Sequence, residues 1–218
     1  DVGLSLPDFM NSGNTLNYNI FAISTDFTNA GYESKKIGNS ASTKYNVYED
    51  VTLTTGFGAD RDSIDTNDTA SNLYKSREGD YLTFKGFYSI SNDKRDSGFQ
   101  PTKGYRIGFG QGLAMPGSDI TYIENNLVGA IYHSISNDYI LSLKSGVNTI
   151  NSIGDEDIKL SDRKFLRQSN LRGFESYGIG PKDGTDHIGG NYSAYASLSS
   201  TIPTPIPDSW NAKSIIFL

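Results

Sequence analysis

The 218-residue sequence contains no cysteine and only seven prolines, two histidines and one tryptophan. Without cysteine, disulfide frameworks and thiolate metal sites are excluded. It also lacks any apolar run near the roughly 18 residues of a transmembrane helix; the longest runs are short, such as Ile215 to Leu218. If the chain meets a bilayer, closed β-structure is the remaining way to span it, because lipid leaves no backbone group unpaired.

Basic residues are fewer than acidic ones, and the first residues do not resemble an export signal. Lysine and arginine number 19 against 25 acidic residues, which gives a net charge of -6 and a pI of about 4.9. This balance argues against a nucleic-acid partner, because proteins that bind nucleic acids carry a basic stripe on their surface. The residues that begin at Asp1 lack the basic and apolar regions of a signal peptide, so we expect a mature or truncated chain.

Aromatic residues are plentiful. The chain carries 14 Tyr and 11 Phe although its mean hydropathy is only -0.45. Disordered chains are poor in aromatics. Low mean hydropathy together with many aromatics fits a β-barrel wall with one apolar face and one face in contact with water.

The dominant pattern is alternation with period two, interrupted by Gly, Asn, Asp and Ser clusters. In 81–91, apolar residues occupy every second position, and 105–115 and 139–148 behave in the same way. We expect about ten strands in one domain, 1–218, with long loops at 60–80, 115–121 and 152–190. Soluble β-sandwiches and lipocalin-like barrels share such alternation. The polar face, rich in Gly, Ser, Asn, Lys and Arg, favours a membrane barrel with a wet lumen.

The sequence contains few residue patterns that indicate an enzyme. His133 and His187 have no second ligand at metal spacing, and the acids around Asp62 lack the glycine and terminal glutamate of an EF-hand. The glycine run 108–112 lies in an alternating strand, so a phosphate loop is excluded. We therefore expect no enzyme activity, no metal and no cofactor.

Two segments are more specific than the alternation. The first, DKRDSGFQPTKG, joins two predicted strands and contains charge, a proline and a permissive glycine. Its marked residues are Asp93, Arg95, Asp96, Pro101 and Gly104. The second lies in the longest loop and reads LRGFESYGIGP. Its marked residues are Leu171, Arg172, Gly173, Phe174, Gly178, Gly180 and Pro181.

In order and spacing, these motifs resemble those of the outer-membrane β-barrel assembly factor family, over most of residues 50–218. The resemblance implies an all-β, antiparallel, up-and-down transmembrane barrel with a long loop folded into the lumen. On this resemblance we expect the chain to cover about ten of sixteen strands, without the family's upstream periplasmic repeats and last strands. It further implies insertion of barrel proteins by strand pairing at a lateral seam. The implied partners are the Gram-negative outer-membrane bilayer, unfolded barrel clients and assembly-machine lipoproteins.

Arg172 is the residue to which the resemblance gives an anchoring role, because a guanidinium pairs bidentately with carboxylates. Gly173 permits a sharp turn and Phe174 can wedge against the inner wall. The family's acidic partners are missing here, however: 192–202 carries serines instead, and the chain stops at Leu218. Glu175 or an acid on another strand remains as a substitute partner.

Two other functions remain open. A secretion transporter of the same superfamily shares the loop motif and passes an unfolded passenger through its lumen. A passive porin-like channel is the alternative from a different class, and it needs opposed charge rows at a constricting loop.

Overall fold

A computed structural model describes residues 1–27, 32–68, 70–136, 138–175, 177–184, 186–203 and 214–218. Strands account for most of these residues, and the helices are single turns. The elements are β1 (Val2–Leu6), η1 (Phe9–Asn11), β2 (Thr15–Phe27), β3 (Tyr32–Tyr48), β4 (Val51–Thr66), α1 (Asn72–Lys75), β5 (Gly79–Asp93), β6 (Gly104–Ala114), β7 (Tyr122–Ser134), β8 (Ile140–Ser152), η2 (Leu160–Asp162), β9 (Lys182–Asp183), β10 (Asp186–His187), β11 (Tyr192–Ile202) and β12 (Ser214–Phe217).

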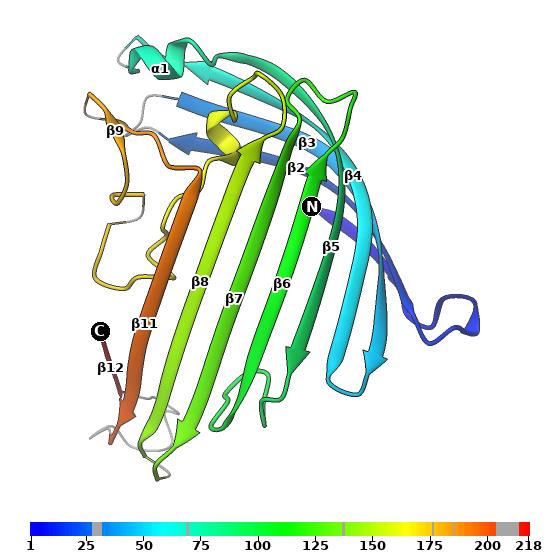
Figure 1. Cartoon of the computed structure of the whole chain (residues 1–218), viewed down its shortest axis with the longest axis vertical. Coiled ribbons are helices and arrows are strands. Elements are labelled where there is room, and N and C mark those ends of the chain that lie inside the picture. The colour runs from blue at the N-terminus through cyan, green and yellow to red at the C-terminus, as the bar shows by residue number, and fades with distance from the viewer. Residues whose placement is uncertain (28–31, 69, 137, 176, 185, 204–213) are drawn as a thin grey trace.

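Ten of these strands form one antiparallel sheet in the order β1-β2-β3-β4-β5-β6-β7-β8-β11-β12. Apart from the step from β8 to β11, every sheet neighbour is also the next strand in sequence. The sheet curves into a trough whose edges, in the described part of the chain, are β1 and β12 (Figure 1). The predicted partial, up-and-down barrel wall of about ten strands is confirmed.

The two ends of the trough differ. Short turns join β3 to β4 and β7 to β8 at the lower end in Figure 1. The upper end carries α1, the connection 115–121 and the long connection between β8 and β11, which also contains β9 and β10. Short turns at one end and long loops at the other are typical of outer-membrane barrels.

Many side chains on the convex face are apolar and exposed. Leu82, Phe84, Tyr88 and Ile90 of β5 are all 39–43% exposed, and they continue across the register to Ile107 and Phe109 of β6. A soluble domain buries such rows. An apolar outer band of this kind is the surface that outer-membrane barrels present to lipid. No helix in the described residues is long and apolar enough to cross a membrane.

One predicted boundary is wrong. The loop expected at 60–80 is shorter, because β4 continues to Thr66 and β5 begins at Gly79. Asp60 and Asp62 therefore lie within a strand, on its concave face. β3, a 17-residue strand without clear apolar alternation, runs between β2 and β4. Backbone pairing on both edges stabilises β3 despite the polar residues on its outer face.

Candidate functional site

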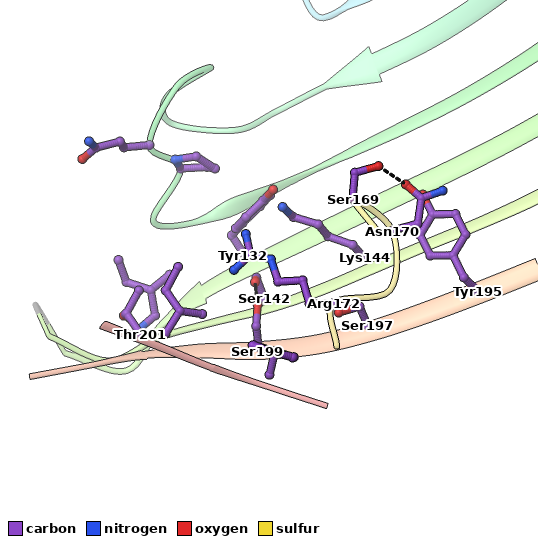
Figure 2. A pocket seen from close by; sticks show the side chains of 15 residues that line it. Tyr132, Ser142, Lys144, Ser169, Asn170, Arg172, Tyr195, Ser197, Ser199 and Thr201 are labelled. Atoms are coloured by element: carbon purple, nitrogen blue, oxygen red, sulfur yellow. Dashed lines mark hydrogen bonds between the residues drawn. The ribbon is translucent and has the colours of Figure 1, made fainter. Parts of the chain in front are cut away.

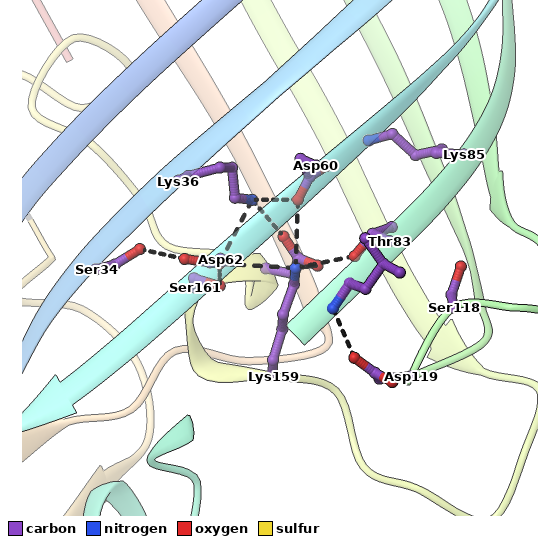
Figure 3. Close-up of polar contacts among 12 residues, drawn as sticks. Ser34, Lys36, Asp60, Asp62, Thr83, Lys85, Ser118, Asp119, Lys159 and Ser161 are labelled. Carbon is purple, nitrogen blue, oxygen red and sulfur yellow. Dashed lines mark hydrogen bonds and ion pairs between the residues drawn. The ribbon is translucent and has the colours of Figure 1, made fainter. Parts of the chain in front are cut away.

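The long connection 153–191, called the lumen loop below, enters the concave side of the trough through a buried root. Ile158, Lys159 and Leu160 are each at most 2% exposed. The Lys159 ammonium lies 3.4 Å from Asp162 Oδ2, 3.6 Å from Asp62 Oδ2 and 3.8 Å from Asp60 Oδ2 (Figure 3). It also donates to Thr83 Oγ1 of β5 at 3.2 Å. The root is thus bonded to two wall strands.

Asp62 stands at the centre of this ion cluster. Its side chain is fully buried, and it accepts hydrogen bonds from Ser34 of β3 at 2.7 Å and from Ser161 of the loop at 2.5 Å. Lys36 of β3 lies 3.6 Å from the same carboxylate and 3.4 Å from Asp162. A buried carboxylate is tolerated when it is both paired and hydrogen-bonded, and Asp62 satisfies both conditions with partners from wall and loop.

A second ionic contact follows directly after the root. Lys164 Nζ lies 2.9 Å from Glu124 of β7, whose other oxygen lies 2.9 Å from Lys85 of β5. The Lys164 backbone is paired in both directions with Gly190, at 2.8 and 3.0 Å. The start of the lumen loop is therefore tied both to the wall and to its own returning end.

The returning end packs against the connection between β4 and β5. Ser71 caps the single turn α1, and two carboxylates accept from its first amides: Asp186 from Ser71 N at 2.9 Å and Asp183 from Leu73 N at 3.1 Å. The Tyr74 hydroxyl donates to the His187 carbonyl at 2.5 Å. Unsatisfied amides at a helix start favour carboxylates, which explains why this hairpin and α1 join.

The predicted loop motif forms the tip of the lumen loop. Gly173 has φ +85°, a backbone conformation that residues with a side chain rarely adopt. Phe174 is 55% exposed. The Arg172 guanidinium lies over the Phe217 ring of β12, 5.9 Å from its centroid. Further along, Gly180 has φ +136° and the Pro181 carbonyl accepts from Ile188 N at 3.0 Å. Gly178 N donates to the Glu175 carbonyl at 3.1 Å, closing the turn that follows Phe174.

Arg172 makes an aromatic contact in place of the carboxylate pair that the family resemblance implies. Within the described ranges the structure pairs it with no acid, and neither Glu175 nor a strand residue substitutes. The serines that occupy the expected acidic position, Ser197 and Ser199, line a cavity together with Arg172. Leu171 is partly buried beside the arginine. The contact with Phe217 nevertheless links the tip to the edge strand β12.

The predicted hairpin motif forms the turn between β5 and β6. Arg95 pairs bidentately with Asp93, at 2.8 and 2.7 Å. Asp96 accepts from the Thr102 hydroxyl and amide and from the Lys103 amide at 2.5, 2.9 and 3.2 Å. The Thr102 hydroxyl, followed by these amides, lowers the pKa of the Asp96 carboxyl to about 2. The turn is therefore fixed by its own charged side chains.

The two motifs meet at one cavity. A space of about 270 Å³ is lined by Gln100 and Pro101 of the hairpin, by Asn170 and Arg172 of the tip, and by Lys144 of β8 (Figure 2). Segments separated by some seventy residues of sequence thus lie together at the short-turn end of the trough. The remaining lining residues are Tyr132, Ile140, Ser142, Ser169, Tyr195, Ser197, Ser199, Thr201, Ile215 and Phe217.

The ion cluster at the root was missed from the sequence. Asp60 and Asp62 were interpreted as loop acids, and Lys159 was not singled out. A signal existed, because continuing the alternation of β4 places both aspartates on the inner face with Arg61 between them on the outer face. Among the described residues, no group of three or more His, Cys, Asp or Glu is arranged to hold a metal.

Fold and site together define a class: an outer-membrane-type β-barrel wall with a loop folded into its lumen. The family model described as the Omp85 superfamily domain matches residues 1–217. The chain belongs to the Omp85 superfamily.

Known proteins of this family resemble the chain over much of its length. It is 27% identical over 193 residues to an outer membrane protein assembly factor BamA of Neorickettsia risticii, covering 87% of this chain and 26% of that protein. It is 33% identical over 148 residues to a SAM50-like protein of Schizosaccharomyces pombe, covering 63% and 30%. The chain therefore spans less than a third of either relative.

A solved structure shows the same fold. BamA of Haemophilus ducreyi lacking POTRA domains 1–3 superposes with a TM-score of 0.85 at 23% identity. The match covers 99% of this chain and 47% of that one.

Proposed function

We propose that this chain is the barrel region of an assembly factor that folds β-barrel proteins and inserts them into an outer membrane. The observation that carries the proposal is the Omp85 superfamily match over residues 1–217. The BamA and SAM50-like relatives support it, because the names of the BamA relatives state assembly of outer membrane proteins. The exposed apolar convex face fits residence in a bilayer.

The proposed mechanism uses backbone hydrogen bonds at the edges of the sheet. Edge strands present unpaired N–H and C=O groups that another chain can extend. In the described residues these edges are β1 and β12. An incoming client strand pairs with such an edge at a lateral seam, so the activity requires no covalent step and no cofactor.

We further propose a Gram-negative outer membrane as the location, with unfolded barrel proteins as clients and assembly-machine lipoproteins as partners. The BamA relatives of Neorickettsia risticii, Nitratidesulfovibrio vulgaris and Neisseria meningitidis support this location. The anchored lumen loop supports a role in bracing the wall while the seam opens.

Substitution of Arg172 by alanine in the full-length protein tests the role of the tip. The contact between Arg172 and Phe217 links the tip to β12, so its loss should slow the assembly of outer-membrane barrels roughly threefold to tenfold. The measurement is the amount of folded client in the membranes of cells that depend on the variant. Arg167→Ala, an exposed arginine of the same loop, is the matched control and should assemble clients normally. Equal assembly by both variants would contradict the proposal.

A further inference from the structure

The lumen loop divides into a buried root and an exposed tip. The root residues Ile158 to Leu160 are almost inaccessible, whereas Arg172 to Glu175 are exposed. Further along the loop, Arg167 and Ser169 line a cavity of about 400 Å³ whose other side is formed by Asn148 of β8 and Ser193 of β11. Open space therefore lies beside the segment that leads from the root to the tip.

Lys159 connects the root to the wall more extensively than any tip residue does. Its ammonium is 2% exposed and faces two β4 carboxylates, a β5 hydroxyl and the carboxylate of Asp162. Lys164, by comparison, is 21% exposed and faces the single carboxylate of Glu124. Arg172 contributes one aromatic contact.

The charges of the root cluster depend on one another. Two lysines, Lys36 and Lys159, are interleaved with three aspartates, so the cluster has a net charge of -1. Burial acts to raise the pKa of the Asp162 carboxyl, but the ammonium groups of Lys159 and Lys36 outweigh it and hold the pKa below its ordinary value. Removing Lys159 would leave three carboxylates in a buried site with one cation, an arrangement that is unfavourable in a low dielectric.

We propose that Lys159 is the positioning residue that holds the lumen loop against β4 and β5 and thereby sets the place of the tip motif at the cavity shared with the hairpin. Arg172 lies at the end of the loop segment 159–172, and the ion pairs of Lys159 fix where that segment starts on the wall. This inference deepens the proposed function and rests on it only for the assembly measurement described below.

The test measures the position of the tip directly. These 218 residues contain no cysteine, and any cysteine elsewhere in the full-length protein is first replaced by serine. Ser169→Cys and Ser197→Cys then place one thiol on the lumen loop next to the tip and one on β11, around the same cavity. A short bismaleimide then cross-links them in the full-length protein in outer-membrane vesicles. In a Lys159→Met background the rate of cross-linking should fall roughly tenfold, because the root is released and the tip samples other positions.

Three further variants distinguish an effect on the position of the tip from an effect on the folding of the barrel. Lys159→Arg keeps the charge and should restore cross-linking, and Lys182→Met, an exposed lysine of the same loop, should leave it unchanged. Should Lys159→Met fail to show the gel mobility of a folded barrel, Lys159→Met with Asp62→Asn removes one charge of each sign. That pair keeps the cluster at -1 and should fold with slow cross-linking.

Normal cross-linking in a folded Lys159→Met barrel overturns the inference, and so does normal cross-linking in the double variant. Slow cross-linking confirms it, whatever the assembly activity. If cross-linking is slow while barrel assembly stays normal, the positioning role stands and the proposed bracing role of the loop fails. The two proposals therefore fail through different measurements.

Discussion

Replacing Asp62 by alanine is expected to lower the free energy of unfolding by about 2–4 kcal/mol. The side chain is fully buried and accepts hydrogen bonds from Ser34 and Ser161, one on the wall and one on the loop. Without the carboxylate, both hydroxyls lose the acceptor that the structure gives them. The substitution also removes a counter-ion that Lys36 and Lys159 share.

Asp60→Ala is the matched control for this prediction. Asp60 lies on the same face of β4, two residues away, and its Oδ2 is 3.8 Å from Lys159 and 3.9 Å from Lys36 without a hydrogen bond. Both substitutions remove one negative charge from a cluster of net charge -1. The difference between them therefore reports the hydrogen bonds of Asp62.

Urea unfolding of the full-length protein in detergent, followed by circular dichroism, measures both values. We expect Asp60→Ala to cost less than Asp62→Ala, because Asp60 Oδ2 pairs with Lys36 and Lys159 but accepts no hydrogen bond. Equal losses for the two variants would show that the hydrogen bonds of Asp62 do not hold root and wall together.

Substitution of Gly104 by alanine is expected to destabilise the turn between β5 and β6 by about 2–3 kcal/mol. Gly104 has φ +95°, and an added Cβ would lie 2.0 Å from the Lys94 carbonyl oxygen. The backbone must shift to relieve this contact. The shift disturbs the hydrogen bond from Lys94 N to the Tyr105 carbonyl, 2.8 Å long, at the start of the strand pair.

Gly98→Ala in the same turn is the control, because no heavy atom lies within 4 Å of its added Cβ. It should change the stability by less than about 0.5 kcal/mol. Urea unfolding in detergent measures the loss of stability, and the mobility of a spin label on a cysteine that replaces Phe99, an exposed residue of the turn, reports the local shift. An equally rigid label in the Gly104→Ala variant and its control would contradict the strain that we assign to Gly104.

Much of the wall was predictable because side chains of a strand alternate between its faces. The apolar residues of 81–91 and 105–115 point outward as their period-two pattern predicts. The pattern failed for β3, whose outer positions include Asn39 and Thr43. There the strand is specified by its neighbours, since it pairs along its length with β2 on one side and β4 on the other.

The motif residues lie on a loop tip and in a turn, positions that glycine, proline and charge commonly mark. The contacts between them were not predictable. Ser161 and Asp62 are 99 residues apart, and no local pattern states which part of a wall a long loop will cover. The same limit applies to Arg172, whose aromatic contact with Phe217 depends on where the root directs the tip.

The central claim is that the full-length protein folds barrel proteins into a membrane. The most direct measurement is the folding rate of an unfolded β-barrel client in phospholipid vesicles that contain the purified full-length protein, compared with empty vesicles. We predict an acceleration of roughly tenfold or more. A large and steady ion conductance of the same vesicles without any acceleration of folding would contradict the account and indicate a passive channel.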